Sequence, residues 1–304
     1  MQIVLEGLPT TLLALAYLLR ARTLARSGRP VPLFRQLLFA AGLIVALIAV
    51  ATPLAPLAEE LQWAHMVQHV LLGDIAALLI VLGLTGALLR PLLGAPVLRH
   101  LRLLSHPVVA FALWATSLYA WHIPFLYEAA VEQPLVHAVE HTSFLGAGIA
   151  MWAAVLGPLP KPAWFGDLPQ LAYVFLMRVI GALLANVLIW SQSPFYPSYV
   201  ATAERHGIAP MTDQNLAGAV LMIEGSIVTI IVFAWLFLRW ARADQQRQDL
   251  LDRAERAGVP LDEARVARAV AAGHGDWLRT RFDRKDSDAA GDAGSVPSRD
   301  GSGN

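Results

Sequence analysis

The sequence has no cysteine among its 304 residues. This absence excludes disulfide bonds, thiolate-bound iron–sulfur clusters, cysteine-based zinc sites and cysteine nucleophiles. A metal ion bound by this chain must therefore be held by histidine, carboxylate, methionine or backbone oxygen. Charge is also scarce: Asp, Glu, Lys and Arg make up 15% of the residues, whereas a soluble globular chain has about 25%.

An excess of one sign of charge is missing as well. The 23 basic and 23 acidic side chains cancel, so no basic field is available to bind nucleic acid. What the sequence has instead is apolar residues, which make up 56% of it, with a mean hydropathy of +0.52. These values exclude a disordered chain and predict an integral membrane protein that contacts the lipid bilayer.

Long apolar stretches are the main pattern in the sequence. A helix that crosses a bilayer needs about 20 mostly apolar residues, and prolines punctuate the ends of these stretches. The first stretch is the weakest, because Arg20 and Arg22 lie near its end, but it lacks the basic start and cleavage site of a signal peptide. We therefore predict an all-α bundle of seven membrane spans: 8–24, 34–58, 61–89, 107–127, 135–156, 168–191 and 216–240.

Charges in the predicted connections alternate along the chain. The first, third and fifth connections and the segment after the last span are basic, whereas the second and fourth carry glutamates. Because cytoplasmic loops are enriched in Lys and Arg, this pattern places the N-terminus outside and the C-terminus in the cytoplasm.

The composition changes after the last span. We predict a membrane domain over 1–243, a charged and alanine-rich cytoplasmic helical segment over 244–285, and a disordered tail over 286–304.

Histidines collect at one membrane face. With the predicted orientation, five of the nine fall at the outer ends of three consecutive spans, and two pairs have the spacing i and i+4, which places both members on one helical face. Two imidazoles one turn apart are a common metal-chelating arrangement. The simpler interpretation is interfacial histidines that bond headgroups, water or loop carbonyls. The candidate metal ligands are His65, His69, His122, His137 and His141.

Further polar and sulfur groups lie near these histidines. Carboxylates and amides orient metal-bound imidazoles through the far ring nitrogen, and the candidates for this role are Gln68, Glu128 and Glu140. Thioether sulfur from Met66 or Met211 would favour copper(I), although ordinary apolar packing explains each methionine alone. Asp213 is either a polar wall of the same site or the N-cap of the helix that it begins.

Three charges fall inside the apolar stretches, namely Asp74, Arg178 and Glu224. An unpaired charge at this depth costs several kcal/mol, so each should face the bundle and find a partner. The sequence predicts a buried network of the three. It serves either as a clamp between helices or as a proton or ion relay that runs inward from the histidines.

Four segments give the chain a family resemblance. They are His65-Met66-Val67-Gln68-His69 with the apolar run to Gly83, His106-Pro107 leading to Trp121-His122-Ile123-Pro124, His137-Ala138-Val139-Glu140-His141 with the run to Met151-Trp152, and Asp213-Gln214-Asn215-Leu216-Ala217-Gly218. With these segments, which span about 35–240, the sequence resembles the Caa3/CtaG family of bacterial cytochrome c oxidase assembly proteins.

The resemblance implies a non-enzymatic, multi-pass protein of the bacterial plasma membrane. Such a protein helps to mature a haem–copper oxidase, whose subunits would be its partners, and delivery of copper is the activity usually suggested for it. The histidines on the outer face would then bind copper and hand it on.

Three other functions stay open from the residues alone. One is a proton- or ion-coupled transporter that uses Asp74, Arg178 and Glu224, although no inverted repeat is evident. Another is a metal-dependent hydrolase with zinc in the histidine cluster and Glu128 or Glu140 as the base. A haem-binding redox protein is disfavoured, because two histidines one turn apart on one helix are poorly placed to ligate the irons of two separate haems. A retinal protein is excluded, because the last span has no lysine.

Overall fold

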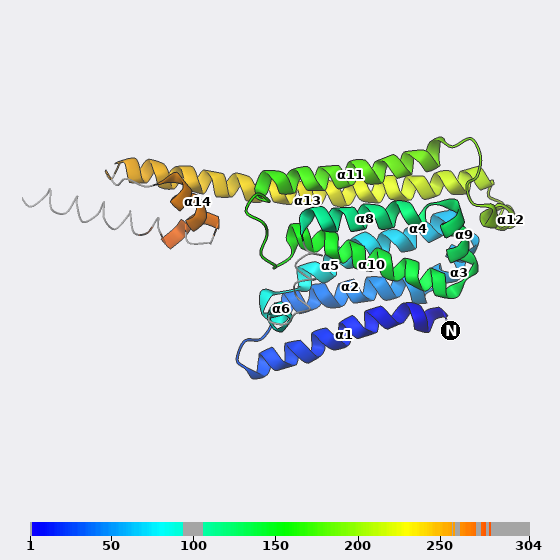
Figure 1. Ribbon diagram of the computed structural model, residues 1–304, viewed down its shortest axis with the longest axis horizontal. Coiled ribbons are helices and arrows are strands. Elements are labelled where there is room, and N and C mark those ends of the chain that lie inside the picture. The colour runs from blue at the N-terminus through cyan, green and yellow to red at the C-terminus, as the bar shows by residue number, and fades with distance from the viewer. Residues whose placement is uncertain are drawn as a thin grey trace, which may run out of the picture. The chain divides into compact units, whose positions relative to one another are not determined.

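The structure is a computed structural model in which residues 2–93, 106–256, 258, 262–271, 275–277 and 280 are described (Figure 1). Every regular element within these ranges is a helix, which confirms the all-α prediction. The chain divides into two compact units, Met1–Ile231 and Val232–Asn304. The predicted tail 286–304 lies outside the described residues, as does part of the segment 244–285.

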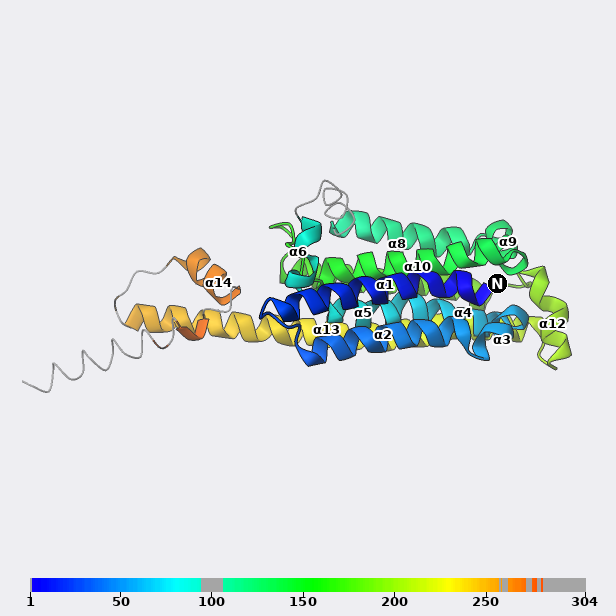
Figure 2. The ribbon, with the colours of Figure 1, turned by 90° about the horizontal axis from the view of Figure 1, so that it is seen from below.

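The long helices of the first unit lie side by side (Figures 1 and 2). One of them is composite, because α4 (Gln62–Val70) continues through a π-helical turn, η1 (Leu71–Ala76), into α5 (Ala77–Gly83). The others are α1 (Gln2–Arg26), α2 (Leu33–Ala51), α8 (Pro107–Trp121), α10 (Pro134–Leu156), α11 (Asp167–Trp190) and the first part of α13 (Pro210–Arg256).

Five helices within the described residues are long and apolar enough to cross a membrane. They are α2, the composite helix Gln62–Gly83, α10, α11 and α13, and the pair of α8 with α9 (Pro124–Glu132) adds a sixth if it forms one bent span. Helix α1, the first predicted span, is not among them. The count of seven therefore stays a prediction, whereas several helices are long and apolar enough to cross a membrane, as expected.

The predicted span 107–127 is not one straight helix. Helices α8 and α9 meet at an angle of 75°, and His122 and Ile123 lie between them. Pro124 explains the break, because a proline disfavours helical backbone in the residue before it, and Ile123 is extended, with φ −67° and ψ 126°. The backbone therefore changes direction between His122 and the first turn of α9.

Two other predicted spans are shorter than expected. The span 34–58 ends at Ala51, and its remainder forms a separate short helix, α3 (Leu54–Glu60), after Pro53. The span 61–89 ends at Gly83, and α6 (Gly86–Leu93) follows as a separate helix. Helices α3, α9 and α12 (Val200–Arg205) lie at the same end of the first unit as the N-terminus, and α6 lies at the opposite end (Figures 1 and 2).

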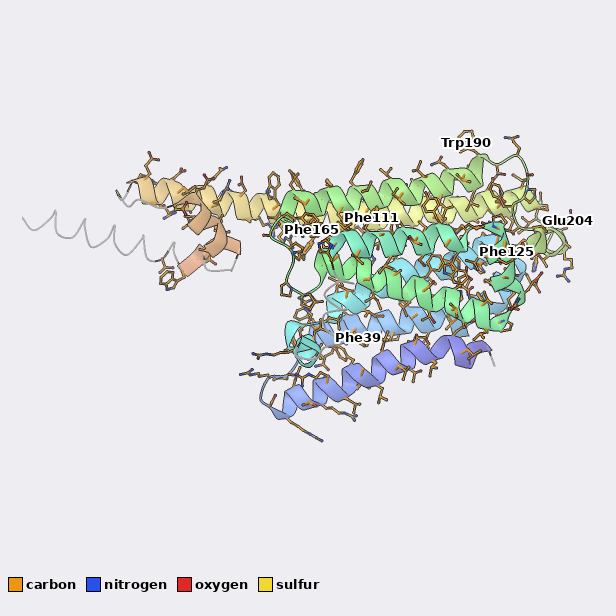
Figure 3. All side chains as sticks on the ribbon, in the orientation of Figure 1. Phe39, Phe111, Phe125, Phe165, Trp190 and Glu204 are labelled. Carbon is orange, nitrogen blue, oxygen red and sulfur yellow. The ribbon has the colours of Figure 1, made fainter. Side chains whose placement is uncertain are left out.

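Apolar side chains cover much of the outside of this unit. Phe125 and Trp190 are 82% and 74% exposed (Figure 3), whereas Phe39 is buried and stacks on Tyr17. Such exposed apolar surface suits a lipid environment, where side chains do not need water.

Glycines allow the helices to approach closely. A Cβ on Gly148 of α10 would lie 2.0 Å from the carbonyl oxygen of Gly73 in η1, and one on Gly218 of α13 would lie 2.8 Å from the carbonyl oxygen of Ala185. Small residues at contacts of this kind are typical of helix packing in membranes, where van der Waals contact drives association.

The second unit contains the rest of α13 and α14 (Glu263–Ala271). Helix α13 passes residue 243 without a break in its helical structure. Leu250, Ala254 and Val266 form a small apolar core within this unit.

We predict that Gly148→Ala destabilises the protein. The helix propensity of alanine favours the change by about 1 kcal/mol, but the clash with backbone at Gly73 should cost about 1–3 kcal/mol more than this gain. Thermal unfolding in detergent measures the effect. The matched control is Gly146→Ala in the same helix, where nothing lies within 4 Å of an added Cβ. Equal melting temperatures of the two variants would contradict the prediction.

Candidate metal centre

Two helices present their HxxxH motifs to each other at the end of the first unit where α3, α9 and α12 lie. Helix α4 carries His65 and His69, and α10 carries His137 and His141. All four side chains are at most 4% exposed. Four buried imidazoles require polar partners or a metal ion, because burying a polar group without compensation costs several kcal/mol.

Asp213 of α13 fixes where α4 begins. Its carboxylate accepts hydrogen bonds from the backbone N–H groups of Gln62 (2.9 Å) and Trp63 (3.0 Å). These are the first two residues of α4, whose N–H groups have no partner within the helix. The expectation that Asp213 is the N-cap of its own helix is wrong, because α13 begins at Pro210 and Asp213 already lies within its first turn. It instead caps the helix that carries His65.

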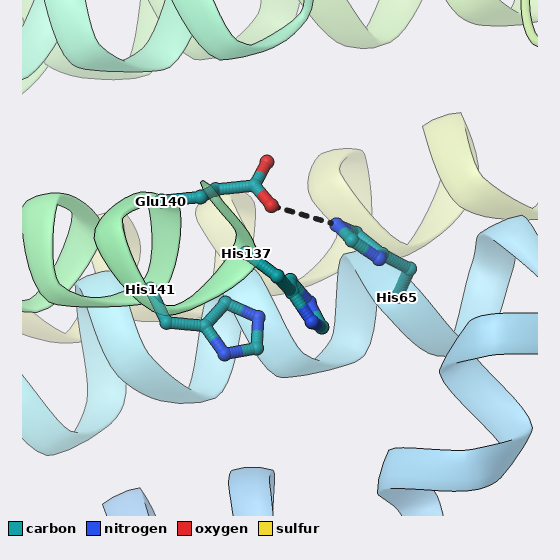
Figure 4. A group of neighbouring side chains, drawn as sticks. All are labelled: His65, His137, Glu140 and His141. Carbon is teal, nitrogen blue, oxygen red and sulfur yellow. Dashed lines mark ion pairs between the residues drawn. The ribbon is translucent and has the colours of Figure 1, made fainter. Parts of the chain in front are cut away.

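Four side chains form the centre of the site. One potential ligand atom from each of His65, His137, Glu140 and His141 lies within 4.8 Å of the others (Figure 4). Three come from adjacent turns of α10 and one from α4. Imidazole nitrogen and carboxylate oxygen are suitable ligands for first-row transition metals. We call these four residues the nitrogen–oxygen set.

Tyr199 orients His65 within this set. The Tyr199 hydroxyl donates to the carbonyl oxygen of Ala58 (2.9 Å), and it lies 3.2 Å from His65 Nδ1. Burial raises the pKa of this phenol well above its usual range, so the hydroxyl keeps its proton. Because that proton goes to Ala58, the phenol oxygen accepts from His65 Nδ1–H. His65 Nε2 therefore carries a lone pair and faces Glu140.

Glu6 of α1 plays the same part for the histidines of α10. Its carboxylate oxygens lie 3.4 Å from His137 Nδ1 and 3.1 Å from His141 Nδ1. A carboxylate on the outer ring nitrogen fixes the tautomer and raises the basicity of a metal ligand. Sequence reasoning did not include Glu6 in the site. The available signal was an acidic residue at the start of the first apolar stretch, at the same end as the histidines.

Glu140 is the most demanding group in the site. Its carboxylate is fully buried, with Oε2 3.6 Å from His65 Nε2 and Oε1 3.4 Å from His69 Nε2. Neither contact is a hydrogen bond, and both carboxylate oxygens and both Nε2 atoms lack hydrogen-bond partners, as does His141 Nε2. A buried carboxylate needs a cation beside it. A metal ion among these atoms would satisfy all of them at once.

The other predicted ligands and supporting residues take different positions. His122 lies beside His69, with ring centroids 5.9 Å apart, but outside the nitrogen–oxygen set. Gln68 ties α4 to α2, because its Nε2 donates to the carbonyl oxygen of Ala49 (2.7 Å). Glu128 accepts from the backbone N–H and the hydroxyl of Ser198, next to Tyr199. Met211 lies in the first turn of α13.

The three charges that fall inside the apolar stretches share one cavity. Asp74, Arg178 and Glu224 line a space of about 70 Å³, which His69 and His122 also line. Arg178 donates to the hydroxyl of Ser226 (2.8 Å), and no ion pair within the described residues joins it to either carboxylate. The three thus meet around a cavity large enough for a few water molecules, and the predicted clamp and relay both stay open.

The family of the chain follows from comparison with known proteins. The model of the family described as "Cytochrome c oxidase caa3 assembly factor (Caa3_CtaG)" matches residues 15–243. The chain belongs to this family. Both HxxxH motifs, His122 and Asp213 lie within the matched range, whereas Glu6 precedes it. The description of the Caa3_CtaG family is that of an assembly factor rather than of an enzyme.

Relatives of this Caa3_CtaG protein are found in mycobacteria. "Uncharacterized protein Mb0105" of Mycobacterium bovis is 23% identical over 285 residues, which cover 88% of this chain and 43% of the relative. "Uncharacterized protein ML1998" of Mycobacterium leprae is 24% identical over 259 residues, which cover 80% of this chain and 39% of the relative. The chain therefore spans less than half the length of these relatives. No solved structure matches it.

We predict that Asp213→Ala lowers stability by about 1–2 kcal/mol, the usual cost of losing a helix cap, and weakens metal binding at His65. Thermal unfolding and metal titration measure the two effects. Thr212→Ala is the control, since Thr212 is the exposed neighbour in the same helix turn. The interpretation fails if Asp213→Ala and Thr212→Ala unfold at the same temperature.

Proposed function

We propose that this Caa3_CtaG protein is a non-enzymatic assembly factor that binds copper at the nitrogen–oxygen set and hands it to a haem–copper cytochrome c oxidase. One observation carries the proposal. One potential ligand atom from each of His65, His137, Glu140 and His141 lies within 4.8 Å of the others, and both oxygens of the buried Glu140 carboxylate lack hydrogen-bond partners. A cation bound between them compensates the carboxylate and uses the imidazole lone pairs.

Copper is the metal that the family description favours. The donor chemistry alone also suits zinc, iron and nickel, but the partner implied for a Caa3_CtaG protein is an oxidase that contains copper. The outer-sphere contacts from Glu6 and Tyr199 orient the imidazoles before metal arrives. Preorganised ligands of this kind bind an ion more tightly, because less conformational freedom is lost on binding.

We further propose seven membrane spans with the N-terminus outside, in the bacterial plasma membrane. Two observations support α1 as the additional span. It runs alongside α10 and α2 (Figures 1 and 2), and Glu6 near its start contacts the metal-binding histidines. The basic residues after α1 then lie in the cytoplasm, and the site lies at the end of the bundle on the side where the subunits of the oxidase would receive copper.

A proton- or ion-coupled transporter is the second candidate function. The cavity shared by Asp74, Arg178 and Glu224 with two histidines favours it, because ionisable residues at this depth often line ion pathways. Asp74→Asn tests it. Loss of ion flux in proteoliposomes, with metal binding intact, would favour the transporter. A metal-dependent hydrolase has less support, because Glu128 is already bonded to Ser198 and Glu140 belongs to the donor set.

Metal binding by the purified protein tests the main proposal. We expect about one tightly bound copper ion at the nitrogen–oxygen set, measured by competition titration and elemental analysis. His137→Ala and Glu140→Ala should each weaken this binding by at least about 10-fold, the lower end of the effect of losing even an outer-sphere partner. His206→Ala is the control, because His206 is exposed and pairs with Glu60 away from the site.

The same variants test the role in assembly. In cells that carry His137→Ala, we expect a lower copper content and activity of the terminal oxidase, with the haem inserted. The His206→Ala strain should behave as wild type. Wild-type levels of oxidase copper in the His137→Ala strain would reject the proposed function, even if the purified protein binds metal.

We predict that Glu6→Gln weakens copper binding by about 10–100-fold, the usual effect of losing a carboxylate behind a metal-bound histidine. A neutral amide cannot match the charge of the carboxylate at His137 Nδ1 and His141 Nδ1. Glu60→Gln is the matched control, because Glu60 also pairs with a histidine but lies at the surface. If both variants bind copper as wild type does, Glu6 has no part in the site.

A further inference from the structure

A second pair of potential ligands lies next to the nitrogen–oxygen set. His122 Nε2 is 3.4 Å from the sulfur of Met66. The two side chains are 7% and 0% exposed. Neither residue belongs to the nitrogen–oxygen set.

The tautomer of His122 follows from its other ring nitrogen. Nδ1 lies 2.6 Å from the carbonyl oxygen of Leu118. A carbonyl oxygen only accepts, so Nδ1 carries the proton. A neutral imidazole has one N–H, and Nε2 therefore presents a lone pair. The Met66 sulfur is also an acceptor, so the two atoms cannot hydrogen-bond to each other. A cation between them would bind both.

The surrounding structure holds His122 in this orientation. The ring lies at the break between α8 and α9, and the Tyr196 hydroxyl donates to the carbonyl oxygen of His122 (2.9 Å). Tyr127 stacks on Tyr196 with ring centroids 3.8 Å apart. A backbone carbonyl on the far nitrogen and a fixed ring plane are the usual support of a metal-bound histidine.

The spacing of the pair fits direct coordination. Zinc, as an example of a first-row metal ion, binds imidazole nitrogen at about 2.0 Å and sulfur at about 2.3 Å. At a tetrahedral angle, these bond lengths place the nitrogen and the sulfur about 3.5 Å apart. His69 supplies a third donor. Its ring is 5.9 Å from that of His122, and neither of its nitrogens has a hydrogen-bond partner.

We propose that Met66 Sδ and His122 Nε2, with His69, form a second metal site that is selective for a soft monovalent cation, copper(I). Thioether sulfur with imidazole prefers copper(I), whereas imidazole with carboxylate also accepts harder divalent ions. His69 faces both Glu140 and His122, so it is the ligand common to the two sites. This inference rests on the proposed function, since it divides the bound metal between two adjacent donor sets.

The experiment compares two probe ions on the purified full-length chain. Silver(I), which is soft and does not change oxidation state under these conditions, reports the Met66–His122 site, and nickel(II) reports the nitrogen–oxygen set. Met66→Leu preserves the volume of the side chain and removes only the sulfur. We expect silver(I) affinity to fall by about 10–100-fold, on the scale of other changes to a metal site, with nickel(II) affinity unchanged. His137→Ala should do the reverse.

Met151→Leu is the matched control, because Met151 is equally buried but lies in α10 away from both sites. If Met66→Leu binds silver(I) as Met151→Leu does, the second site does not exist, while normal nickel(II) binding would leave the proposed function standing. If the wild type binds neither ion, the proposed function fails first. X-ray absorption of the copper(I) form gives a second readout: a sulfur neighbour should be present in wild type and absent in Met66→Leu.

Discussion

The structure of the end of the bundle that carries the two HxxxH motifs depends on one constraint, the fully buried carboxylate of Glu140. A negative charge without hydrogen bonds in a medium of low dielectric must be compensated by a cation, and the nearest ring nitrogens, His65 Nε2 and His69 Nε2, also lack hydrogen-bond partners. The neighbouring groups serve this arrangement. Tyr199 and Glu6 take up the outer nitrogens of the histidines, and Asp213 fixes the start of the helix that brings His65 to the site.

Helix packing provides the geometry that this constraint needs. Helix α10 approaches η1 closely because Gly148 lies against the backbone of Gly73, and the two HxxxH motifs lie near this contact on the same pair of helices. The π-helical turn begins at Leu71, two residues after His69, and contains Asp74, which lines the same cavity as this histidine. Single π-helical turns are frequent at functional sites. The close contact between α10 and η1 therefore helps to set the positions of the buried polar side chains on the same helices.

The break at Pro124 gives His122 a separate role. In a straight helix, the residues that follow His122 would continue along the bundle, but the bend places the ring at a helix end beside the sulfur of Met66. The two proposed donor sets would then differ in hardness, with His69 between them. Adjacent sites of different chemistry suit a protein that accepts a metal ion in one environment and releases it in another.

The sequence by itself determined the helical class, most of the apolar helices and the two HxxxH motifs, because hydropathy and the spacing i and i+4 are local properties of the chain. It also identified Glu140, since this residue lies beside His141. Only the tertiary structure decided the roles of Glu6, Tyr199 and Asp213, which act on helices more than 100 residues away in sequence. The separation of His122 from the nitrogen–oxygen set likewise depends on how the bent helix packs. Contacts between distant helices leave no periodic signal, and for this reason the sequence indicated the candidate ligands but not the arrangement of side chains around them.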